Sequence, residues 1–474
     1  MQRRFSFALF AATLAVGVGL DRPAAAQSQA NARPNVVVLL ADDLGYADIG
    51  AQGRSSDVRT PNIDSLAKAG TRFTDGYVTC PVCSPTRAGF ITGKYQERFG
   101  HEFNPGPNRP ANFGLPRDQT TIGNAFKQNG YATGLIGKWH LGFDPGLRPQ
   151  DRGFDEFFGF LGGAHKFIGN EETSGSETDI FRGNKAVAES SYLTDAVGRE
   201  ASAFIDHHAK EPFFLYVPFN DVHNPQQAPA KYTDRFPNET DPKRKQLLAK
   251  LSALDDAVGV VLNTLRQNNL EENTLIVFFS DNGGPTPGNG SRNTPLSGYK
   301  GQVLEGGIRV PFIVQWKAKL PQGQVLSQPI HSLDIFPTAL AAIGGKTPSD
   351  LKLDGKNLLP LISGQTQAAP HEALFWRFGA QWAVRSGNLK FVHRATGEEG
   401  LYDLANDIAE QNDLSAKQPE DLKRLKTLYA NWNGELTAPL WRQEAAARQT
   451  KRAAKLATAK GGTTQPAVNA ADAD

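Results

Sequence analysis

The sequence predicts an α/β fold: a large mixed, mostly parallel sheet sandwiched by helices, with a smaller C-terminal subdomain built on an antiparallel sheet. Three observations indicate this fold. Between residues 33 and 360, apolar runs of strand length alternate with helical patterns. Several of these runs are apolar on both faces, which is typical of strands buried within a parallel sheet. After about residue 365 the runs become short and are separated by Gly, Ser and Asn, which favours antiparallel strands.

The apolar runs predict the strands of the large sheet, at residues 35–41, 133–136, 212–219, 275–280 and 311–316. Two helices are also indicated. Thr60 and Pro61 supply an N-cap and an N1 proline to a helix that closes at Gly70. Leucine and valine recur every three or four residues from Leu247 to Leu265, which predicts a long amphipathic helix.

The chain divides into four predicted regions: a signal peptide (1–26), an N-terminal α/β domain (33–360), a small C-terminal subdomain (365–440) and a disordered tail (442–474). The C-terminal subdomain combines strand-like pieces at 374–376, 382–384 and 389–392 with a helix at about 418–432. The tail is rich in Ala, Lys, Arg, Thr and Gln and contains no aromatic residue, so it lacks the means to form a core.

The N-terminus has the three-part layout of a secretory signal peptide. Arg3 and Arg4 form a positive head, an apolar stretch runs from Phe5 to Leu20, and small residues follow at 23–26. The stretch is shorter than the roughly 20 apolar residues that cross a membrane, so we expect no membrane anchor. We therefore expect an exported protein, periplasmic or secreted. The paired arginines leave open whether export is of the Sec or the twin-arginine type.

Composition and charge narrow the possible partners. The 474 residues are 39% hydrophobic and 21% charged, with a formal net charge of +2. This balance argues against a polyanionic partner such as nucleic acid. Cys80 and Cys83, three residues apart, are the two cysteines of the chain. They could form a local disulfide or remain two buried thiols. Their spacing also resembles a redox motif, but no thioredoxin-like context supports that interpretation.

Polar residues follow the predicted strands at the points where they end. Asp42 and Asp43 follow the first strand, and Asp281 and Asn282 follow the fourth. In open α/β sheets ligands bind at the carboxyl ends of the strands, so we expect these residues to share one site. Each pair alone could be a turn or a helix cap. Together they form an all-oxygen set, which favours calcium or magnesium over zinc.

Cationic and proton-transferring side chains are expected beside this set: Arg87, Lys138, His140, His223 and Lys300. Such a combination suits a tetrahedral oxyanion, either sulfate or phosphate. The alternatives are structural histidines and a surface lysine at position 300. Among the other histidines, His165 is the best candidate for contact with substrate, because it lies in a Gly-rich stretch.

The stretch from Cys83 to Gly93, Cys-Ser-Pro-Thr-Arg-Ala-Gly-Phe-Ile-Thr-Gly, resembles the signature that directs oxidation of cysteine to formylglycine in sulfatases. Further matches follow in the expected order at residues 137–142, 298–301 and 401–404. The resemblance begins at Arg33 and covers nearly all of the mature chain. It is to the formylglycine-dependent sulfatases of the alkaline phosphatase superfamily, of the arylsulfatase A and N-acetylgalactosamine-6-sulfatase type.

The resemblance implies a role for each candidate residue. Asp42, Asp43, Asp281, Asn282 and the formylglycine oxygen at position 83 would hold one calcium ion, with magnesium as the alternative. Arg87 would anchor the hydrated aldehyde, and Asp281 would assist its attacking hydroxyl. Lys138, Lys300 and His223 would hold the sulfate, and His223 or Lys300 would protonate the departing alkoxide. His140 would take the proton from the second hydroxyl. In one departure, Val222 precedes His223 where many relatives have proline.

The implied activity is hydrolysis of a sulfuric ester on a sulfated carbohydrate or aryl sulfate. The expected partners are a sulfated small-molecule or oligosaccharide substrate and a formylglycine-generating enzyme during maturation. Residues 155–184 resemble the variable insert of sulfatases that act on sugar sulfates. Two alternatives stay open: a phosphodiester or phosphonate monoester hydrolase of the same fold, and a non-catalytic sulfated-glycan binder in which Cys83 remains a thiol.

Overall fold

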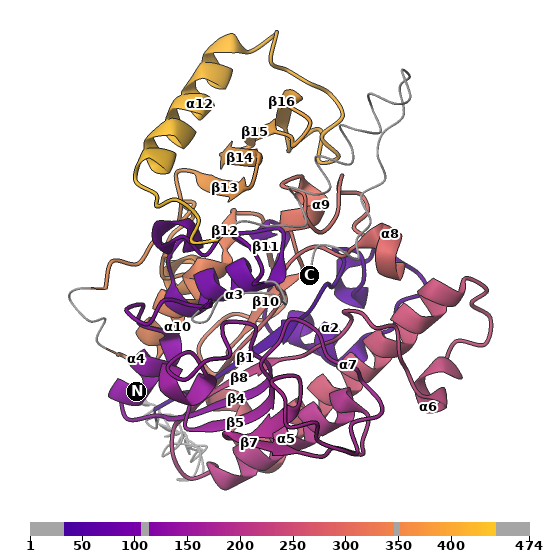
Figure 1. The fold of residues 1–474 in the computed structure, drawn as a ribbon. Coiled ribbons are helices and arrows are strands. Elements are labelled where there is room, and N and C mark those ends of the chain that lie inside the picture. The colour runs from indigo at the N-terminus through magenta and orange to yellow at the C-terminus, as the bar shows by residue number, and fades with distance from the viewer. Residues whose placement is uncertain (1–32, 106–112, 346–350, 442–474) are drawn as a thin grey trace, which may run out of the picture. The chain divides into compact units, whose positions relative to one another are not determined.

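The computed structural model describes residues 33–105, 113–345 and 351–441. Its centre is a ten-stranded mixed sheet in the order β11-β2-β10-β9-β1-β8-β4-β5-β6-β7 (Figure 1), which confirms the predicted fold class. The predicted signal peptide (1–26) and the predicted tail (442–474) lie outside the described residues. Among the residues that are described, no helix combines the length and the apolar character needed to cross a bilayer.

The middle of the sheet is parallel, as predicted. β1 (Asn35–Ala41) lies between β8 (Phe213–Pro218) and β9 (Thr274–Ser280), and β4 (Ala132–Lys138) pairs with the other side of β8. All residues of β1, β8 and β9 are buried, which explains their continuous apolar runs. Because these four strands are parallel, their carboxyl ends meet at one edge of the sheet.

The strand β10 (Phe312–Gln315) runs in the opposite direction, although its apolar run resembled those of the parallel strands. It pairs antiparallel with both β9 and β2 (Thr71–Phe73). The connecting residues 281–311 therefore leave and re-enter the sheet at the same edge. All four residues of β10 are buried, so a run that is apolar on both faces reports burial rather than strand direction.

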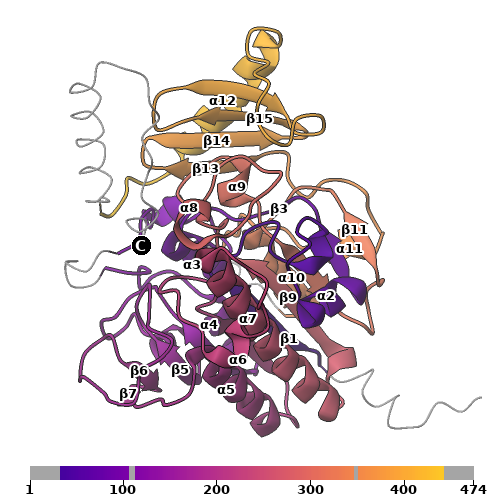
Figure 2. The same cartoon turned by 90° about the vertical axis from the view of Figure 1, so that its right-hand side faces the viewer.

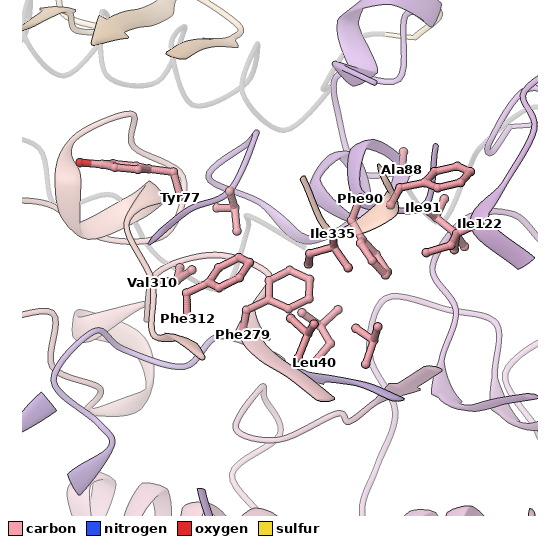
Figure 3. Close-up of a cluster of buried hydrophobic side chains, with 14 of the residues drawn as sticks. Leu40, Tyr77, Ala88, Phe90, Ile91, Ile122, Phe279, Val310, Phe312 and Ile335 are labelled. Carbon is pink, nitrogen blue, oxygen red and sulfur yellow. The ribbon is translucent and has the colours of Figure 1, made fainter. Parts of the chain in front are cut away.

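Helices cover both faces of the sheet, and the residues of β1 alternate between them. Val36, Val38 and Leu40 belong to the core shared with α3 (Cys83–Thr92), α4 (Ile122–Gln128) and α10 (Ile335–Ala342). Figure 3 shows this core around Leu40, where side chains of the sheet meet those of the covering helices.

The opposite face of the sheet buries Val37 and Leu39 beneath α2 (Pro61–Lys68), α5 (Leu193–His207) and α7 (Pro242–Gln267). α5 and α7 pack along each other in front of the sheet in Figure 2. Both predicted helices are confirmed here, as α2 and α7. The second is longer than the leucine pattern indicated, because Asp241 caps it and Pro242 opens it.

The C-terminal subdomain is a four-stranded antiparallel sheet covered by one helix (Figure 1, orange to yellow). Its strands are β13 (Leu374–Phe378), β14 (Gln381–Ser386), β15 (Leu389–His393) and β16 (Glu399–Asp403), and α12 (Pro419–Gly434) packs on β14 and β15. The fourth strand was not predicted. The indole Nε1 of Trp376 donates a 2.6 Å hydrogen bond to the carbonyl of Val78, which joins this sheet to the α/β part. The boundary predicted between residues 360 and 365 remains a prediction.

The insert at residues 155–184 extends the large sheet: β5 (Glu156–Phe160) adds in parallel to β4, and β6 (Ile180–Arg182) adds an antiparallel strand. Directly after the insert, β7 (Lys185–Val187) pairs antiparallel with β6. Within the described ranges, the remaining elements are β3 (Gly76–Tyr77), β11 (Gln324–Leu326), β12 (Ile330–His331), α6 (Ala230–Thr233), α8 (Thr286–Asn289), α9 (Glu305–Ile308) and α11 (Leu359–Ile362), with 3-10 turns at Gly50–Gln52, Gln96–Phe99, Pro149–Arg152, Glu271–Asn273 and Ser332–Asp334.

Candidate active site

The carboxyl edge of the parallel strands brings all of the sequence-predicted site residues into one region. Backbone pairing continues past the strand ends and aligns the segments that carry them. The amide of Asp42 donates to the carbonyl of Asp221 at 2.7 Å, and the amide of Val222 donates to the carbonyl of Asp42 at 2.6 Å. On the other side, the amide of Asp281 donates to the carbonyl of Ala41 at 3.1 Å. The predicted convergence of strand ends is therefore present.

Cys83 is the first residue of α3, as expected for a short helix that starts at the cysteine motif. Its side chain is fully buried, and its Sγ lies 3.7 Å from Oδ1 of Asp42. Burial raises the pKa of the Cys83 thiol well above its usual range, although Lys138 and Lys300 act in the opposite direction. Cys80 is also a buried free thiol, so the pair forms neither a disulfide nor a redox dithiol bridge in this structure.

Arg87 lies one helical turn after Cys83, which places both side chains on the same face of α3. Its Nη2 and Nε donate to Oδ2 of Asp281 at 2.7 and 3.0 Å, and its Nη1 donates to the carbonyl of Lys138 at 3.2 Å. Burial alone would lower the pKa of Arg87, but the carboxylates of Asp281 and Asp42 outweigh burial and raise it. The guanidinium is therefore a fixed positive charge beside position 83.

Three carboxylates and three cations share this buried space. The acids are Asp42, Asp43 and Asp281, and the bases are Arg87, Lys138 and Lys300. Nζ of Lys138 lies 2.6 Å from Oδ2 of Asp42, and Nζ of Lys300 lies 3.1 and 3.2 Å from the two oxygens of Asp43. The formal charges of the six side chains sum to zero. Burial and the neighbouring Asp42 raise the pKa of Asp281, against the effect of Arg87.

The oxygen atoms of this cluster fit a hard divalent cation. Nδ2 of Asn282 donates to Oδ1 of Asp43 at 2.7 Å, so the side-chain amide oxygen of Asn282 points away from that hydrogen bond. Oδ1 of Asn282 is buried and has no hydrogen-bond partner among the residues that the structure describes. A buried acceptor without a donor is costly, and a cation would satisfy it. Carboxylate and amide oxygens are the ligands that calcium prefers.

A second set of donors overlaps this one. Ligand atoms of Asp42, Asp43, Cys83 and His223 all lie within 4.8 Å of one another. A site that used the sulfur of Cys83 and the nitrogen of His223 would suit zinc instead. The two sets share both aspartates, so the kind of metal that the site would suit depends on whether position 83 offers sulfur or oxygen.

The two histidines reach the site from different strand ends. His223 follows β8 through a cis peptide bond between Asp221 and Val222. Its Nδ1 lies 2.7 Å from the carbonyl of Asn224, and its Nε2 lies 3.8 Å from Oδ2 of Asp43. Because a carbonyl oxygen can only accept, the contact with Asn224 requires a proton on Nδ1, and the other ring nitrogen, Nε2, is the one that faces the carboxylate of Asp43.

His140 follows β4 and adopts a positive φ of 59°. Its carbonyl accepts a 2.7 Å hydrogen bond from Oγ of Ser84, the residue after Cys83. Its ring lies directly over Gly163, because a β-carbon built at Gly163 would lie 2.6 Å from Nε2 of His140. Only glycine at 163 leaves room for the ring in this position.

Comparison with known proteins places this geometry in a family. The model of the sulfatase family matches residues 34–345, and that of the C-terminal region of N-sulphoglucosamine sulphohydrolase matches residues 299–430. The chain belongs to the sulfatase family. The predicted family is thereby confirmed, and the protein is an arylsulfatase-like hydrolase of sulfate esters.

Individual relatives agree with this assignment. The sulfatase is 34% identical to arylsulfatase J of Mus musculus over 72% of its own chain, and it spans 58% of that protein's length. It is 33% identical to N-acetylgalactosamine-6-sulfatase of Mus musculus, covering 75% of its own chain and 71% of the relative. The crystal structure of Ps i-CgsB in complex with k-i-k-neocarrahexaose matches with a TM-score of 0.82 and 37% identity, over 86% of this chain and 94% of that one.

The structure also shows a site residue of this sulfatase that the sequence did not reveal, Lys250 of α7. Its side chain is fully buried, and its Nζ donates to the carbonyls of His223 and, at 3.2 Å, of Pro225. Nζ also lies 3.9 Å from the ring centroid of Phe167. Burial lowers the pKa of Lys250 to about 8, although Asp221 acts in the opposite direction. The sequence did contain a sign of this burial, because Lys250 lies three residues after Leu247 and therefore on the apolar face of the predicted helix.

His165, the other histidine singled out in the sequence, is held by its own loop. Its Nδ1 and Nε2 each lie 2.8 Å from a backbone carbonyl, those of Lys166 and Thr178. Its own carbonyl accepts a 2.9 Å hydrogen bond from Nδ2 of Asn220, shortly after β8. The backbone carbonyl of His165 thus links the insert of the sulfatase to the segment after β8, while the ring nitrogens of His165 contact carbonyls within the insert itself.

Proposed function

We propose that this sulfatase removes sulfate from a sulfated carbohydrate by means of a formylglycine made from Cys83 and one bound calcium ion. The proposal is carried by the buried convergence of Cys83 and Arg87 with three carboxylates and two lysines at one sheet edge. The carbohydrate class is supported by the 37% identity to a protein solved with an oligosaccharide. Aryl sulfates are expected to serve as artificial substrates.

Calcium would be held by Asp42, Asp43, Asp281 and Asn282, together with the formylglycine oxygen at position 83. The unpartnered Oδ1 of Asn282 and the three converging carboxylates support this ligand set. A bound calcium ion would supply two positive charges to this pocket. Since the formal charges of Asp42, Asp43, Asp281, Arg87, Lys138 and Lys300 sum to zero, the pocket with calcium bound would carry a net charge of about +2, which would favour an anionic ester.

Formylglycine, as the hydrated aldehyde, supplies two hydroxyls on one carbon, one to attack sulfur and one to release sulfate intramolecularly. Arg87 orients position 83 from the same helical face, and Asp281 fixes that guanidinium. Lys138 and Lys300 hold the sulfate oxygens by charge-assisted hydrogen bonds. His223 or Lys300 protonates the departing alkoxide, and His140 takes the proton of the second hydroxyl. Export through the N-terminal signal peptide and maturation by a formylglycine-generating enzyme are parts of the same proposal.

The first experiment measures the mass of the peptide that contains position 83, after digestion of protein expressed in its native host. The mass loss that accompanies conversion of the thiol to an aldehyde, with trapping of the aldehyde by a hydrazine, supports the proposal. A peptide that contains only unmodified cysteine in catalytically active protein would refute the formylglycine mechanism. In inactive protein, the same result would favour a sulfated-glycan binder.

The second experiment identifies the ester. Inorganic sulfate released from sulfated oligosaccharides, beginning with neocarrahexaoses, is compared with turnover of an aryl sulfate, a phosphodiester and a phosphonate monoester. The proposal predicts the highest kcat/KM for a sulfated oligosaccharide and loss of turnover in Cys83→Ala. A higher kcat/KM for the phosphorus esters would overturn it in favour of the phosphodiester or phosphonate hydrolase.

A further inference from the structure

The segment that carries Lys300 has no regular secondary structure to fix it. Lys300 lies between Gly298 and Gly301, which adopt positive φ angles of 83° and 85°. Glycines in this region of φ space give the backbone on both sides of the lysine wide conformational freedom. The position of the Lys300 ammonium group relative to the sulfate site therefore depends on the contacts that hold this segment from outside.

One side of the segment is held by the segment that leads to Cys83. The amide of Gly301 donates a 2.8 Å hydrogen bond to the carbonyl of Pro81, two residues before Cys83. The amide of Lys300 itself points toward the carbonyl of Gly284 at 3.5 Å, in the loop that carries Asn282. These two contacts hold the backbone at Lys300 against the segment that leads to Cys83 and against the loop that carries Asn282.

The other side is held by the C-terminal subdomain, through Gln381 at the start of β14. Oε1 of Gln381 accepts a 3.1 Å hydrogen bond from the amide of Val303, and its Nε2 donates a 2.6 Å hydrogen bond to the carbonyl of Gly301. The side-chain amide of Gln381 thus binds the backbone of the segment at two places, Gly301 and Val303. The carbonyl that it binds belongs to the residue immediately after Lys300.

A second C-terminal contact anchors the segment further along. The amide of Glu305 donates to Oε2 of Glu410 at 2.8 Å, and the carboxylate of Glu305 accepts from Nζ of Lys390 at 2.8 Å. Lys390 and Glu305 are fully buried and Glu410 is 4% exposed, so these contacts exclude water. Of these two contacts from the C-terminal subdomain, that of Gln381 is therefore the nearer to Lys300, and Glu410 and Lys390 hold the segment further along, at Glu305.

We infer that Gln381 is a positioning residue for the desulfation reaction, through which the C-terminal sheet places Lys300 against the sulfate. The inference rests on the proposed role of Lys300. It makes the C-terminal subdomain a part of the catalytic apparatus, although that subdomain contributes no side chain to the cluster of carboxylates and cations.

The test is a double-mutant cycle on the matured enzyme with an aryl sulfate as substrate. Gln381→Met keeps the length of the side chain and removes both hydrogen bonds. We expect kcat/KM to fall about 10- to 100-fold, because displacement of a binding group by about 1 Å costs a factor of this size. In the Lys300→Met background, the same substitution should change kcat/KM by less than about 2-fold, because its effect passes through the lysine. Gln328→Met, which removes one hydrogen bond to the carbonyl of Gln367, is the matched control.

The outcomes separate the two claims. If Lys300→Met leaves kcat/KM unchanged, the proposed role of Lys300 fails and the inference fails with it. If Lys300→Met lowers kcat/KM but Gln381→Met behaves like Gln328→Met, only the inference is overturned. Losses that multiply in the double variant also overturn it, since they show that Gln381 acts independently of Lys300. Should Gln381→Met fail to fold, Gln381→Glu keeps the acceptor for Val303 and replaces the donor to Gly301, and the same cycle applies.

Discussion

Replacing Gly163 by alanine tests whether His140 acts in the reaction. The added β-carbon would lie 2.6 Å from Nε2 of His140, whereas ordinary contact begins at 3.4 Å, so the ring must move by about 0.8 Å. The ring is the far end of a side chain and can yield, so the fold should tolerate the change. A displacement close to 1 Å in a proton-transferring group lowers the rate about 10²-fold, or about 2.7 kcal/mol in the activation free energy.

The assay is the steady-state kcat for an aryl sulfate, together with the thermal unfolding midpoint of each variant. Gly162→Ala is a matched control on the neighbouring residue, because its β-carbon would meet nothing closer than 3.7 Å and neither glycine has a positive φ. We expect Gly163→Ala to lose about 10²-fold in kcat while both variants keep the wild-type midpoint within a few degrees. Equal kcat values for the two alanine variants would refute the reasoning about His140.

Three further predictions concern charge and metal. Lys250→Met should lower the free energy of unfolding in urea by about 1–3 kcal/mol and also reduce kcat, because the carbonyls of His223 and Pro225 lose a buried donor; an unchanged kcat would contradict its support of His223. Calcium at 100 times its Kd should stabilise the metal-free protein by about 2.7 kcal/mol and Asn282→Ala should reduce that gain, whereas a larger gain from zinc would favour the set with Cys83 and His223. Burial raises the pKa of Glu410 to about 7, so the folded state favours the protonated carboxyl more than the unfolded state does. The stability gained in this way is complete below the unfolded-state pKa of Glu410 and is lost as the pH rises through 7. Urea unfolding should therefore show a loss of at most about 3 kcal/mol between pH 5 and pH 8, and Glu410→Gln should flatten it; an equal slope in the variant would exclude Glu410 as the cause.

The parts of the site that follow strand ends could be predicted from the sequence because they depend on local rules. Asp42 and Asp281 each follow a run of buried residues, and a parallel sheet necessarily gathers such ends at one edge. The spacing of Cys83 and Arg87 likewise fixes their common face once a helix forms. These inferences need only the period of a helix or a strand and the direction of the sheet.

The remaining features depend on contacts between distant segments, which no local pattern encodes. The direction of β10 is set by a connection that stays at one edge, and burial of its four residues looks the same in either direction. Lys250 and Gln381 act through backbone carbonyls far along the chain, and a carbonyl carries no sequence signal. The orientation of His165 depends in the same way on the carbonyl of Thr178.

Because β10 runs antiparallel to β9, residues 281–311 form an excursion that begins and ends at the same edge of the sheet. The register between Phe279 and Phe312 is set by the two strands themselves, so the excursion between them can change in length without shifting the sheet. Loop closure adds only about 0.6 kcal/mol for each doubling of length. Changes of length between Asn282 and Lys300 would therefore leave the strands beneath this excursion in register.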